Sequence, residues 1–196
     1  MIIGITGSIG SGKTTVAKLF SKHWYNRIDA DEIGHEILKK DSIVYKKIIE
    51  NLGNGILDKK KSIDRKKLGD IVFKDNKKLQ KLNSIMHPII IENIKNQIKK
   101  IKKKCKDKTR IVIDAPLLLE TKTKNLVDKV IVVKCDKKNI IQRLNKKYPE
   151  EKIEKILKSQ MLLNEKIKYA DFVIDNNRDL KHLEKQVKKI IQKLEK

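Results

Sequence analysis

The stretch Gly4–Phe20 reads GITGSIGSGKTTVAKLF, and it decides the fold. A short apolar run at residues 2–6 is typical of a strand, and residues 13–23 carry apolar side chains at helical spacing. The pattern Gly7-x-x-x-x-Gly12-Lys13-Thr14 therefore lies between a strand and a helix, the context in which it binds nucleotides. Backbone N–H groups of such a loop and the helix N-terminus cradle phosphate oxygens. The motif predicts a nucleotide site and leaves the reaction open.

Two side chains of the loop have expected tasks. Lys13 reaches the β- and γ-phosphates, and the Thr14 hydroxyl ligates Mg²⁺. Proteins with this loop include molecular switches, pumps, motors and enzymes that transfer phosphate. Other segments of the sequence have to distinguish among these functions. A GTPase needs an Asn-Lys-x-Asp motif that recognises guanine, placed after one of the last strands of the sheet. The sequence NKKY at 145–148 lacks the Asp. The GTPase alternative is therefore weak.

The remainder of the chain alternates between expected strands and helices, which favours an α/β fold with a parallel sheet covered on both faces. Apolar runs predict strands at 110–116, 129–135 and 171–176, and NRIDAD at 26–31 is interpreted as a strand-like edge that ends in two carboxylates. Helical spacing predicts helices at about 137–147, 150–167 and 179–195. Residues 32–104 are mostly helical, and Pro88 is expected to start a new helix. The strandless segments 32–92 and 138–168 are candidate lobes inserted into the core.

Carboxylates follow two of the expected strands. Asp29 and Asp31 lie at the end of the strand at 26–31, where open α/β sheets bind ligands. If the strand continues, alternation places both on one side, where a carboxylate accepts the proton of an attacking hydroxyl or holds a metal-bound water. Alternatively, Asp31 caps the helix that starts near Glu32. Asp114 in IVIDAP is either a metal-site acid or a plain strand-end acid.

Arginine is rare among the basic residues, with 5 Arg in 48. Arginine is hard to replace where its planar fork binds phosphate with two hydrogen bonds. Arg143, in the segment 138–168, is therefore a candidate for closing over the transferred phosphate, and Arg65 for holding an anionic acceptor; both also fit a surface role. The other three flank strands or helices and are interpreted as structural: Arg27, Arg110 and Arg178. His87 lies next to Pro88. A histidine in such a position more often caps a helix or packs in the core than takes part in catalysis.

The net charge of +23 raises the alternative of a nucleic-acid-binding protein. The 43 Lys that remain after subtracting 5 Arg from 48, together with 31 Ile against 4 Ala, are typical of an A/T-rich genome filling permissive positions. Nucleic-acid readers favour Arg and aromatic residues, and aromatic residues make up 4% of this chain. We therefore interpret the charge as a solvated lysine coat that attracts anionic substrates, and we expect no nucleic-acid partner.

No apolar run approaches the roughly 18–20 residues that cross a bilayer, so no membrane partner is expected. The first expected strand begins at Ile2, which leaves no room for a signal peptide. Cys105 and Cys135 are far apart and form no Cys-x-x-Cys pair, so they are interpreted as isolated thiols. These features predict a cytoplasmic protein.

Eight segments of the chain form a recognisable order: GITGSIGSGKTT, IDADEIGHEI, IDRKKLGDIVF, LNSIMHPII, DAPLLLE, CDKKNIIQRL, KILKSQ and YADFVIDNN. Together, over about residues 1–177, they resemble the dephospho-CoA kinase family. The loop alone is generic, whereas Asp-Ala-Asp, Ile-Met-His-Pro and Pro-Leu-Leu-Leu-Glu in this order are specific. The resemblance implies a P-loop kinase fold with a parallel five-stranded sheet flanked by helices, a helical lobe that binds the CoA-type acceptor, and a helical lid.

The resemblance also implies residue roles. Asp31 matches the family's presumed general base, and Thr6, Lys13 and Thr14 match its phosphate and metal positions. Arg143 matches a lid arginine. The expected ATP-binding residues are Gly7, Ser8, Ile9, Gly10, Ser11, Gly12, Lys13, Thr14, Thr15, Arg143, Asn176 and Asn177. The expected acceptor-side residues, which include both carboxylates of the Asp pair, are Thr6, Asp29, Asp31, Arg65, His87, Pro116, Leu117 and Glu120.

The chain departs from the family pattern in its expected lid. A second arginine usually follows the first, and Lys146-Lys147 stand there. Many members carry Arg-Ile before the lid glutamine, and Ile156-Leu157 occupy that place ahead of Gln160. Lysine keeps the charge but loses the planar fork. In the loop, Ser8 replaces a usual glycine.

The resemblance implies an ATP- and Mg²⁺-dependent kinase that phosphorylates the ribose 3′-hydroxyl of dephospho-CoA, and we expect it to be a monomer or weak homo-oligomer. The expected catalytic residues are Asp31, Lys13 and Arg143. A kinase of another small acceptor, such as a nucleoside monophosphate, is the alternative. The expected domains are a core of residues 1–31, 93–137 and 169–196, an acceptor lobe of residues 32–92, and a lid of residues 138–168.

Overall fold

The computed structural model describes residues 1–105 and 109–195 of the chain. By its contacts the chain forms two compact units. The first unit comprises Met1–Ala30 and Gln97–Lys196, and the second comprises Asp31–Asn96. The predicted acceptor lobe, residues 32–92, falls inside the second unit. None of the helices in the described ranges is long and apolar enough to cross a membrane.

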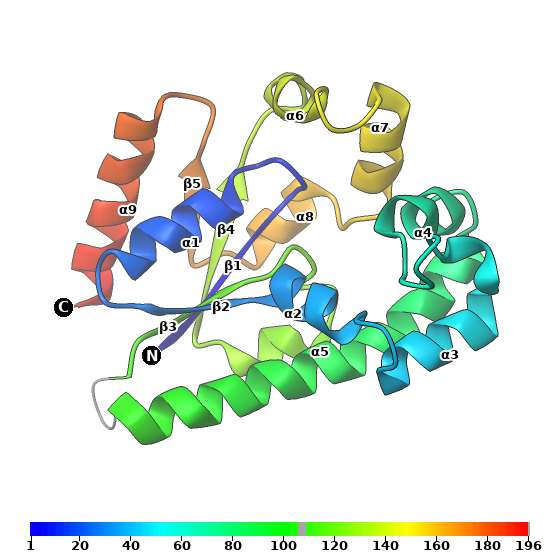
Figure 1. The fold of residues 1–196 in the computed structure, drawn as a ribbon. Helices are drawn as coiled ribbons and strands as arrows, with labels where there is room; N and C mark the ends of the chain where they lie inside the picture. Colours follow the sequence, from blue (N-terminus) through cyan, green and yellow to red (C-terminus); the bar gives the residue numbers. More distant parts are fainter. Residues whose placement is uncertain (106–108, 196) are drawn as a thin grey trace. The chain divides into compact units, whose positions relative to one another are not determined.

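A five-stranded parallel sheet forms the centre of the first unit (Figure 1). Its strands are β1 (Ile2–Gly7), β2 (Asn26–Asp29), β3 (Ile111–Asp114), β4 (Lys129–Lys134) and β5 (Phe172–Asp175). The strand order is β2-β3-β1-β4-β5, with β1 in the middle. Every residue of β1 and β3 is buried, as continuous apolar runs require when a sheet is covered on both faces. The predicted five-stranded parallel sheet flanked by helices is confirmed.

Helices of the first unit cover the sheet. On one face, α1 (Lys13–Ser21) and α9 (Leu180–Leu194) pack together and against the strands, and Ile3 and Ile5 of β1 lie in this core. Side chains alternate along a strand, so Gly4 faces the other side. A Cβ atom at Gly4 would lie 2.5 Å from Leu118, which shows that the segment after β3 packs closely on that second face.

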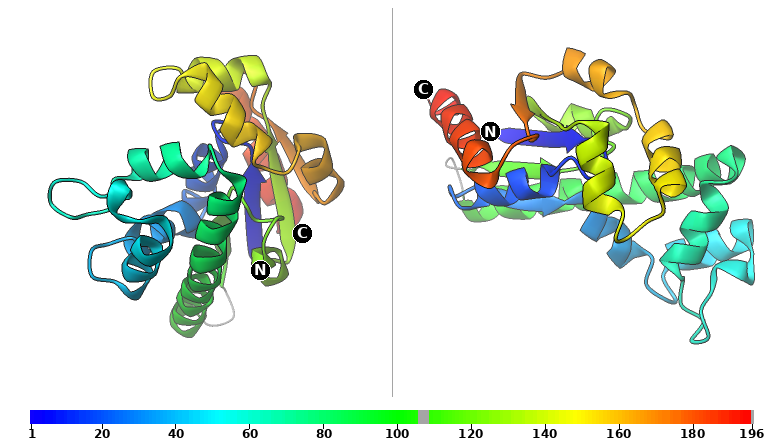
Figure 2. Two further views of the ribbon diagram at one scale, coloured as in Figure 1. Left: turned by 90° about the vertical axis from the view of Figure 1, so that its right-hand side faces the viewer. Right: turned by 90° about the horizontal axis from the view of Figure 1, so that it is seen from above.

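The segment 138–168 contains no strand, as predicted. It holds α6 (Lys137–Leu144), α7 (Glu150–Lys158) and α8 (Leu163–Lys168). The helices α6 and α7 pack against each other (Figure 2) around a small cluster of their own. The buried members of this cluster are Cys135, Ile140 and Ile153. The single helix predicted at 150–167 is instead two helices, because the chain between α7 and α8 turns away to make hydrogen bonds elsewhere in the unit.

The second unit is helical and has a separate core. It contains α2 (Ala30–Ile37), α3 (Ile43–Leu52), the 3-10 turn η1 (Asn54–Ile56), α4 (Arg65–Val72) and most of α5 (Asn76–Cys105). Ser42 and Asp64 accept backbone N–H bonds at the starts of α3 and α4, which satisfies donors that a helix N-terminus leaves unpaired. The buried core residues are Val44, Ile48, Ile56, Leu68, Val72 and Leu82.

Two local predictions are wrong. Pro88 does not start a helix but lies inside α5, which runs for 30 residues. The packing of Leu82 and Ile89 on either side of Pro88 compensates for the backbone hydrogen bond that proline cannot donate. The strand at 26–31 ends at Asp29, and α2 begins at Ala30, so alternation along a strand does not relate Asp29 to Asp31.

Candidate active site

The loop between β1 and α1 has the backbone of a phosphate cradle. Gly10 and Gly12 adopt φ angles of 72° and 91°, in the left-handed region where side-chain-bearing residues are strained. The N–H of Ser11 donates to the Ser8 carbonyl at 3.1 Å and closes a turn within the loop. Gly12 caps the N-terminus of α1. The N–H groups of the first turn of α1 are therefore available to an anion.

Side chains of the loop support the same interpretation. Lys13, the first residue of α1, is only 8% exposed, which is unusual for a lysine unless it serves a charged partner. Thr14 follows it in the first turn and presents a hydroxyl, the kind of oxygen donor that Mg²⁺ prefers. Ser11 is 1% exposed, and its Oγ has no hydrogen-bond partner within the described residues. The residues present thus fit a nucleotide phosphate group with its Mg²⁺.

Asn176 and Arg143 form a wall beside the loop. The Asn176 amide donates to the Ser11 carbonyl at 2.7 Å. Arg143 donates from Nη2 to the Asn176 carbonyl at 2.8 Å, and from Nη1 to the Gly10 and Ser11 carbonyls at 3.3 and 3.5 Å. The same Nη1 lies 3.4 Å from the Cys135 sulfur. Burial raises the pKa of the Cys135 thiol, with Arg143 opposing the shift. The structure therefore brings these two predicted ATP-binding residues to the loop.

Asn177 follows Asn176 in the sequence, but its side chain bonds to α6 and not to the loop. Its Oδ1 accepts the Asp136 N–H at 2.8 Å and the Asn139 side-chain amide at 3.0 Å. Asp136 is the N-cap residue of α6. Asn177 thus joins the end of β5 to the start of the helix that carries Arg143.

The segment after β3 is held to the end of β1. The Pro116 carbonyl accepts the Thr6 hydroxyl at 3.0 Å and the Lys166 ammonium at 2.7 Å. The Glu120 carboxylate accepts the same ammonium at 2.9 Å and the Met161 N–H at 3.0 Å. Predicted acceptor-side residues of the first unit are therefore joined by Lys166, which the sequence did not single out. Leu117 belongs to the same segment, and its carbonyl accepts the Thr121 hydroxyl.

Gln160 is a residue whose partner the sequence analysis did not identify. Its side-chain oxygen accepts the N–H of Ile9, in the phosphate loop, at 3.0 Å. Gln160 and Met161 lie in the turn between α7 and α8. This turn therefore contacts the loop through one residue and Glu120 through the next. The motif KILKSQ marked Gln160 by resemblance but gave no indication of its partner.

Carboxylates also meet where β2 and β3 end. Asp29 and Asp114 are register partners in these strands, and Arg27 forms an ion pair with each, at 3.2 Å to Asp114. The interpretation of Arg27 as structural agrees with this placement. Asp114 is 2% exposed, and its Oδ1 has no hydrogen-bond partner in the described part of the chain. A buried carboxylate oxygen without a partner is costly, which makes Asp114 a stronger candidate for a metal-bound water than its sequence context indicated.

Three predicted residues belong to the second unit. Asp31 is exposed in the first turn of α2, directly after the strand that ends at Asp29. Arg65 is exposed and begins α4. His87 is half-buried in the middle of α5, so it does not begin a helix as expected. Their catalytic and acceptor-binding roles stay predictions.

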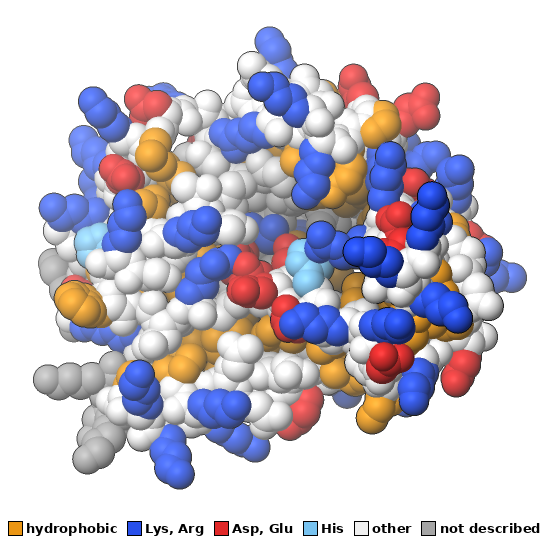
Figure 3. Space-filling view, in the orientation of Figure 1, with side chains coloured by type: hydrophobic (Ala, Val, Ile, Leu, Met, Phe, Trp, Pro, Cys, Tyr) orange, Lys and Arg blue, Asp and Glu red, His pale blue; other side chains and the backbone are white. Residues whose placement is uncertain are grey.

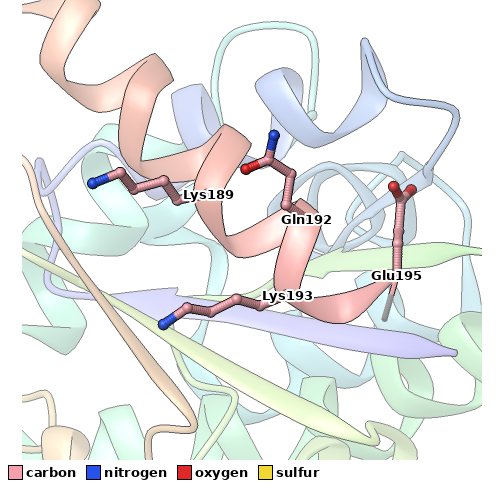
Figure 4. Close-up of a pocket in the computed structure, with 4 residues that line it drawn as sticks. All are labelled: Lys189, Gln192, Lys193 and Glu195. Atoms are coloured by element: carbon pink, nitrogen blue, oxygen red, sulfur yellow. The ribbon is translucent and has the colours of Figure 1, made fainter.

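Surface charge does not gather into one nucleic-acid-binding patch on the face that Figure 3 shows. Lys and Arg side chains are scattered over that face among acidic and apolar ones. A pocket lies along α9, and Figure 4 shows its lining residues: Lys189, Gln192, Lys193 and Glu195. All four come from one helix, and none is a predicted site residue. Over residues 1–105 and 109–195, no group of three or more His, Cys, Asp or Glu is arranged to hold a metal ion.

Comparison with known proteins places these features in a family. The model of the dephospho-CoA kinase family matches residues 1–182. Dephospho-CoA kinase of Aquifex aeolicus is 42% identical over 193 residues, which cover 98% of this chain and 96% of the relative. The enzyme of Fusobacterium nucleatum is 44% identical over 194 residues, covering 98% and 97%.

Solved structures agree with the sequence relatives. Dephospho-CoA kinase from Campylobacter jejuni has a TM-score of 0.68 at 32% identity and covers 98% of this chain and 96% of its own. Shikimate kinase from Acinetobacter baumannii, at 15% identity and a TM-score of 0.55, covers 98% and 92% and shares the P-loop kinase fold. The predicted fold is therefore confirmed, and the chain belongs to the dephospho-CoA kinase family.

Proposed function

We propose that this protein transfers the γ-phosphoryl group of ATP to the ribose 3′-hydroxyl of dephospho-CoA, giving coenzyme A and ADP. The observation that carries the proposal is the family match over residues 1–182, which spans both the phosphate loop and the specific Pro-Leu-Leu-Leu-Glu segment. The buried Lys13 at the start of α1 supports the donor side. The segment Pro116–Glu120, tied to Thr6 and Lys166, supports the acceptor side.

In this proposal Asp31 accepts the proton of the attacking hydroxyl, while Lys13 and the loop N–H groups stabilise the charge on the transferred phosphoryl group. The Thr14 hydroxyl would hold Mg²⁺, which would supply positive charge next to the phosphates. A lid of residues 138–168 excludes water, which would otherwise receive the phosphoryl group.

The proposal extends to the parts and the setting of the enzyme. Residues 32–92 serve as the acceptor lobe, and Arg65 and His87 contribute to it. Asn176 and Asn177 lie beside the adenine of ATP. Arg143 binds ATP from the lid, and contact with the transferred phosphate requires it to exchange its carbonyl partners for phosphate oxygens. The protein works in the cytoplasm as a monomer or weak homo-oligomer, without a nucleic-acid partner.

The decisive experiment offers purified protein ATP and Mg²⁺ with either dephospho-CoA or AMP and measures ADP and the phosphorylated product. We expect turnover with dephospho-CoA and at least about 100-fold less with AMP, since a site built to bind one acceptor's polar groups rejects an analogue that leaves them unpaired. Lys13→Met should abolish product, and the exposed Lys18→Met in the same helix should not. Equal or faster phosphorylation of AMP would support the nucleoside monophosphate alternative.

A further inference from the structure

Lys166 differs from the other lysines of this chain. Its side chain is 0% exposed, and within the described residues only Lys13 shares with it the status of a buried lysine. Lysine is almost never fully buried unless its charge is paired. Lys166 lies in α8, whose other charged residues, such as Lys168, face solvent. A specific set of partners has to explain this burial.

Two oxygen atoms accept hydrogen bonds from the buried ammonium and so compensate for the loss of its hydration. The Pro116 carbonyl lies at 2.7 Å and the Glu120 carboxylate at 2.9 Å, the latter on a side chain that is 20% exposed. Burial lowers the pKa of Lys166, the Glu120 carboxylate opposes this shift, and the positive charge of Lys13 adds to it.

Each of these two oxygens also accepts a second hydrogen bond. Pro116 accepts the Thr6 hydroxyl at the end of β1, and Glu120 accepts the Met161 N–H in the turn between α7 and α8. The Lys166 ammonium therefore joins three segments that are distant in sequence: the strand that leads into the phosphate loop, the segment after β3, and the C-terminal end of the predicted lid. All three belong to the first unit.

We infer that Lys166 is a positioning residue of the kinase, which fixes the Pro116 carbonyl and the Glu120 carboxylate beside the end of β1 so that the acceptor-side segment keeps its register with the phosphate loop. This inference rests on the proposed function for the assignment of that segment to the acceptor. Lys166 need not touch either substrate. It acts through the backbone at Pro116 and the side chain of Glu120.

Stability alone is a poor explanation for this arrangement. A buried ion pair contributes little net stability, since the desolvation of both charges offsets their attraction, and an apolar residue of similar size often serves as well. What an apolar residue cannot do is donate to a carbonyl and a carboxylate at the same time. The arrangement therefore specifies geometry, and an error of about 1 Å in the position of a reacting group costs on the order of 100-fold in rate.

The test compares Lys166→Met with Lys168→Met, two substitutions in the same helix of which only the first removes the buried donor. We expect Lys166→Met to lower kcat/KM for dephospho-CoA about 30- to 100-fold at saturating ATP, while the Kd for ATP changes less than about threefold. Lys168→Met, whose pair with Glu165 is exposed, should leave both unchanged. Equal losses in the two variants, or unchanged acceptor kinetics in Lys166→Met, would overturn the inference.

A second measurement does not depend on the acceptor. Hydrogen exchange of the backbone should become faster at Met161, whose N–H is bonded to Glu120, in Lys166→Met and not in Lys168→Met. If Lys166→Met does not fold, Lys166→Gln, which retains one donor group, takes its place in both measurements. Unchanged exchange at Met161 would refute the positioning role. If the wild-type protein does not phosphorylate dephospho-CoA but Lys166→Met still exchanges faster at Met161, the proposed function is refuted while the link from Lys166 through Glu120 to Met161 stands.

Discussion

The Asn176 side-chain amide donates to the backbone carbonyl of Ser11 at 2.7 Å, across the neighbouring residue Gly12. A Cβ atom on Gly12 would overlap the nitrogen of that amide. Gly12 also has a φ of 91° and caps α1. The wall beside the nucleotide loop therefore depends on the absence of one methyl group.

Gly12→Ala should weaken nucleotide binding. The added methyl group forces Asn176 off Ser11 and strains a left-handed backbone position, at a cost of about 1–2 kcal/mol. We expect the Kd for ATP, measured by calorimetry, to rise at least about tenfold, and Tm to fall by roughly 3–6 °C. Gly55→Ala is the matched control, because nothing lies within 4 Å of its Cβ position. An ATP affinity equal to that of the wild type would show that the loop does not need the Asn176 contact.

Asp31→Asn tests the proposed general base. The substitution keeps size and polarity but removes the group that takes the hydroxyl proton. Loss of a general base typically lowers kcat by about 100- to 10,000-fold. We expect a loss of that order in dephospho-CoA phosphorylation, with ATP affinity changed by less than about threefold. Glu32→Gln, one residue along in the same helical turn, controls for lost charge at the N-terminus of α2. Near-normal turnover of Asp31→Asn would remove Asp31 from the chemistry.

Much of the fold was predictable because its signals are local. Four of the five strands are short, largely apolar runs, whereas β2 reads Asn-Arg-Ile-Asp, and the Gly-rich loop has its motif between the first strand and the first helix. Pro88 shows where local rules fail. The sequence rule starts a helix at this proline, but the packing of Leu82 and Ile89 in the second unit keeps α5 continuous through it.

The site was less predictable because burial and pairing are tertiary properties. Lys166 is one of 43 lysines, and nothing in its neighbouring sequence separates it from the solvent-exposed Lys168. Gln160 was marked only as the end of a motif, yet it accepts a hydrogen bond from the loop residue Ile9. Arg143 was predicted through its rarity as arginine, and the structure does place it against the loop.

The hydrogen bonds of Asp171 are expected to contribute to the stability of the fold in a way that depends on pH. Burial raises the pKa of its carboxyl group, but hydrogen bonds from the Lys129 ammonium and the Val130 N–H outweigh burial and hold the pKa below its ordinary value. A lowered pKa means that this stabilisation is present above the ordinary aspartate pKa of about 3.9 and is lost as the pH falls through the lower folded value. Asp171→Asn should therefore lower Tm at pH 7, with a deficit that shrinks below about pH 3.

The control for Asp171 is Asp41→Asn, an exposed aspartate in a left-handed position that asparagine also tolerates. Its Tm should follow that of the wild type across the same pH range. Thermal unfolding followed by circular dichroism between pH 2 and pH 7 gives both curves. A deficit for Asp171→Asn that stays constant with pH would mean that packing, and not the charge of Asp171, links β5 to β4.

Arg143→Lys distinguishes two uses of the lid arginine. The guanidinium holds the carbonyls of Gly10 and Asn176 with its two terminal nitrogens, which a lysine cannot reproduce. Because these contacts shape the nucleotide wall, we expect KM for ATP to rise about tenfold and kcat to fall by a smaller factor. Lys138→Gln, at an exposed position near the start of the same helix, should change neither. A fall in kcat at constant KM would instead place Arg143 on the transferred phosphate in the transition state.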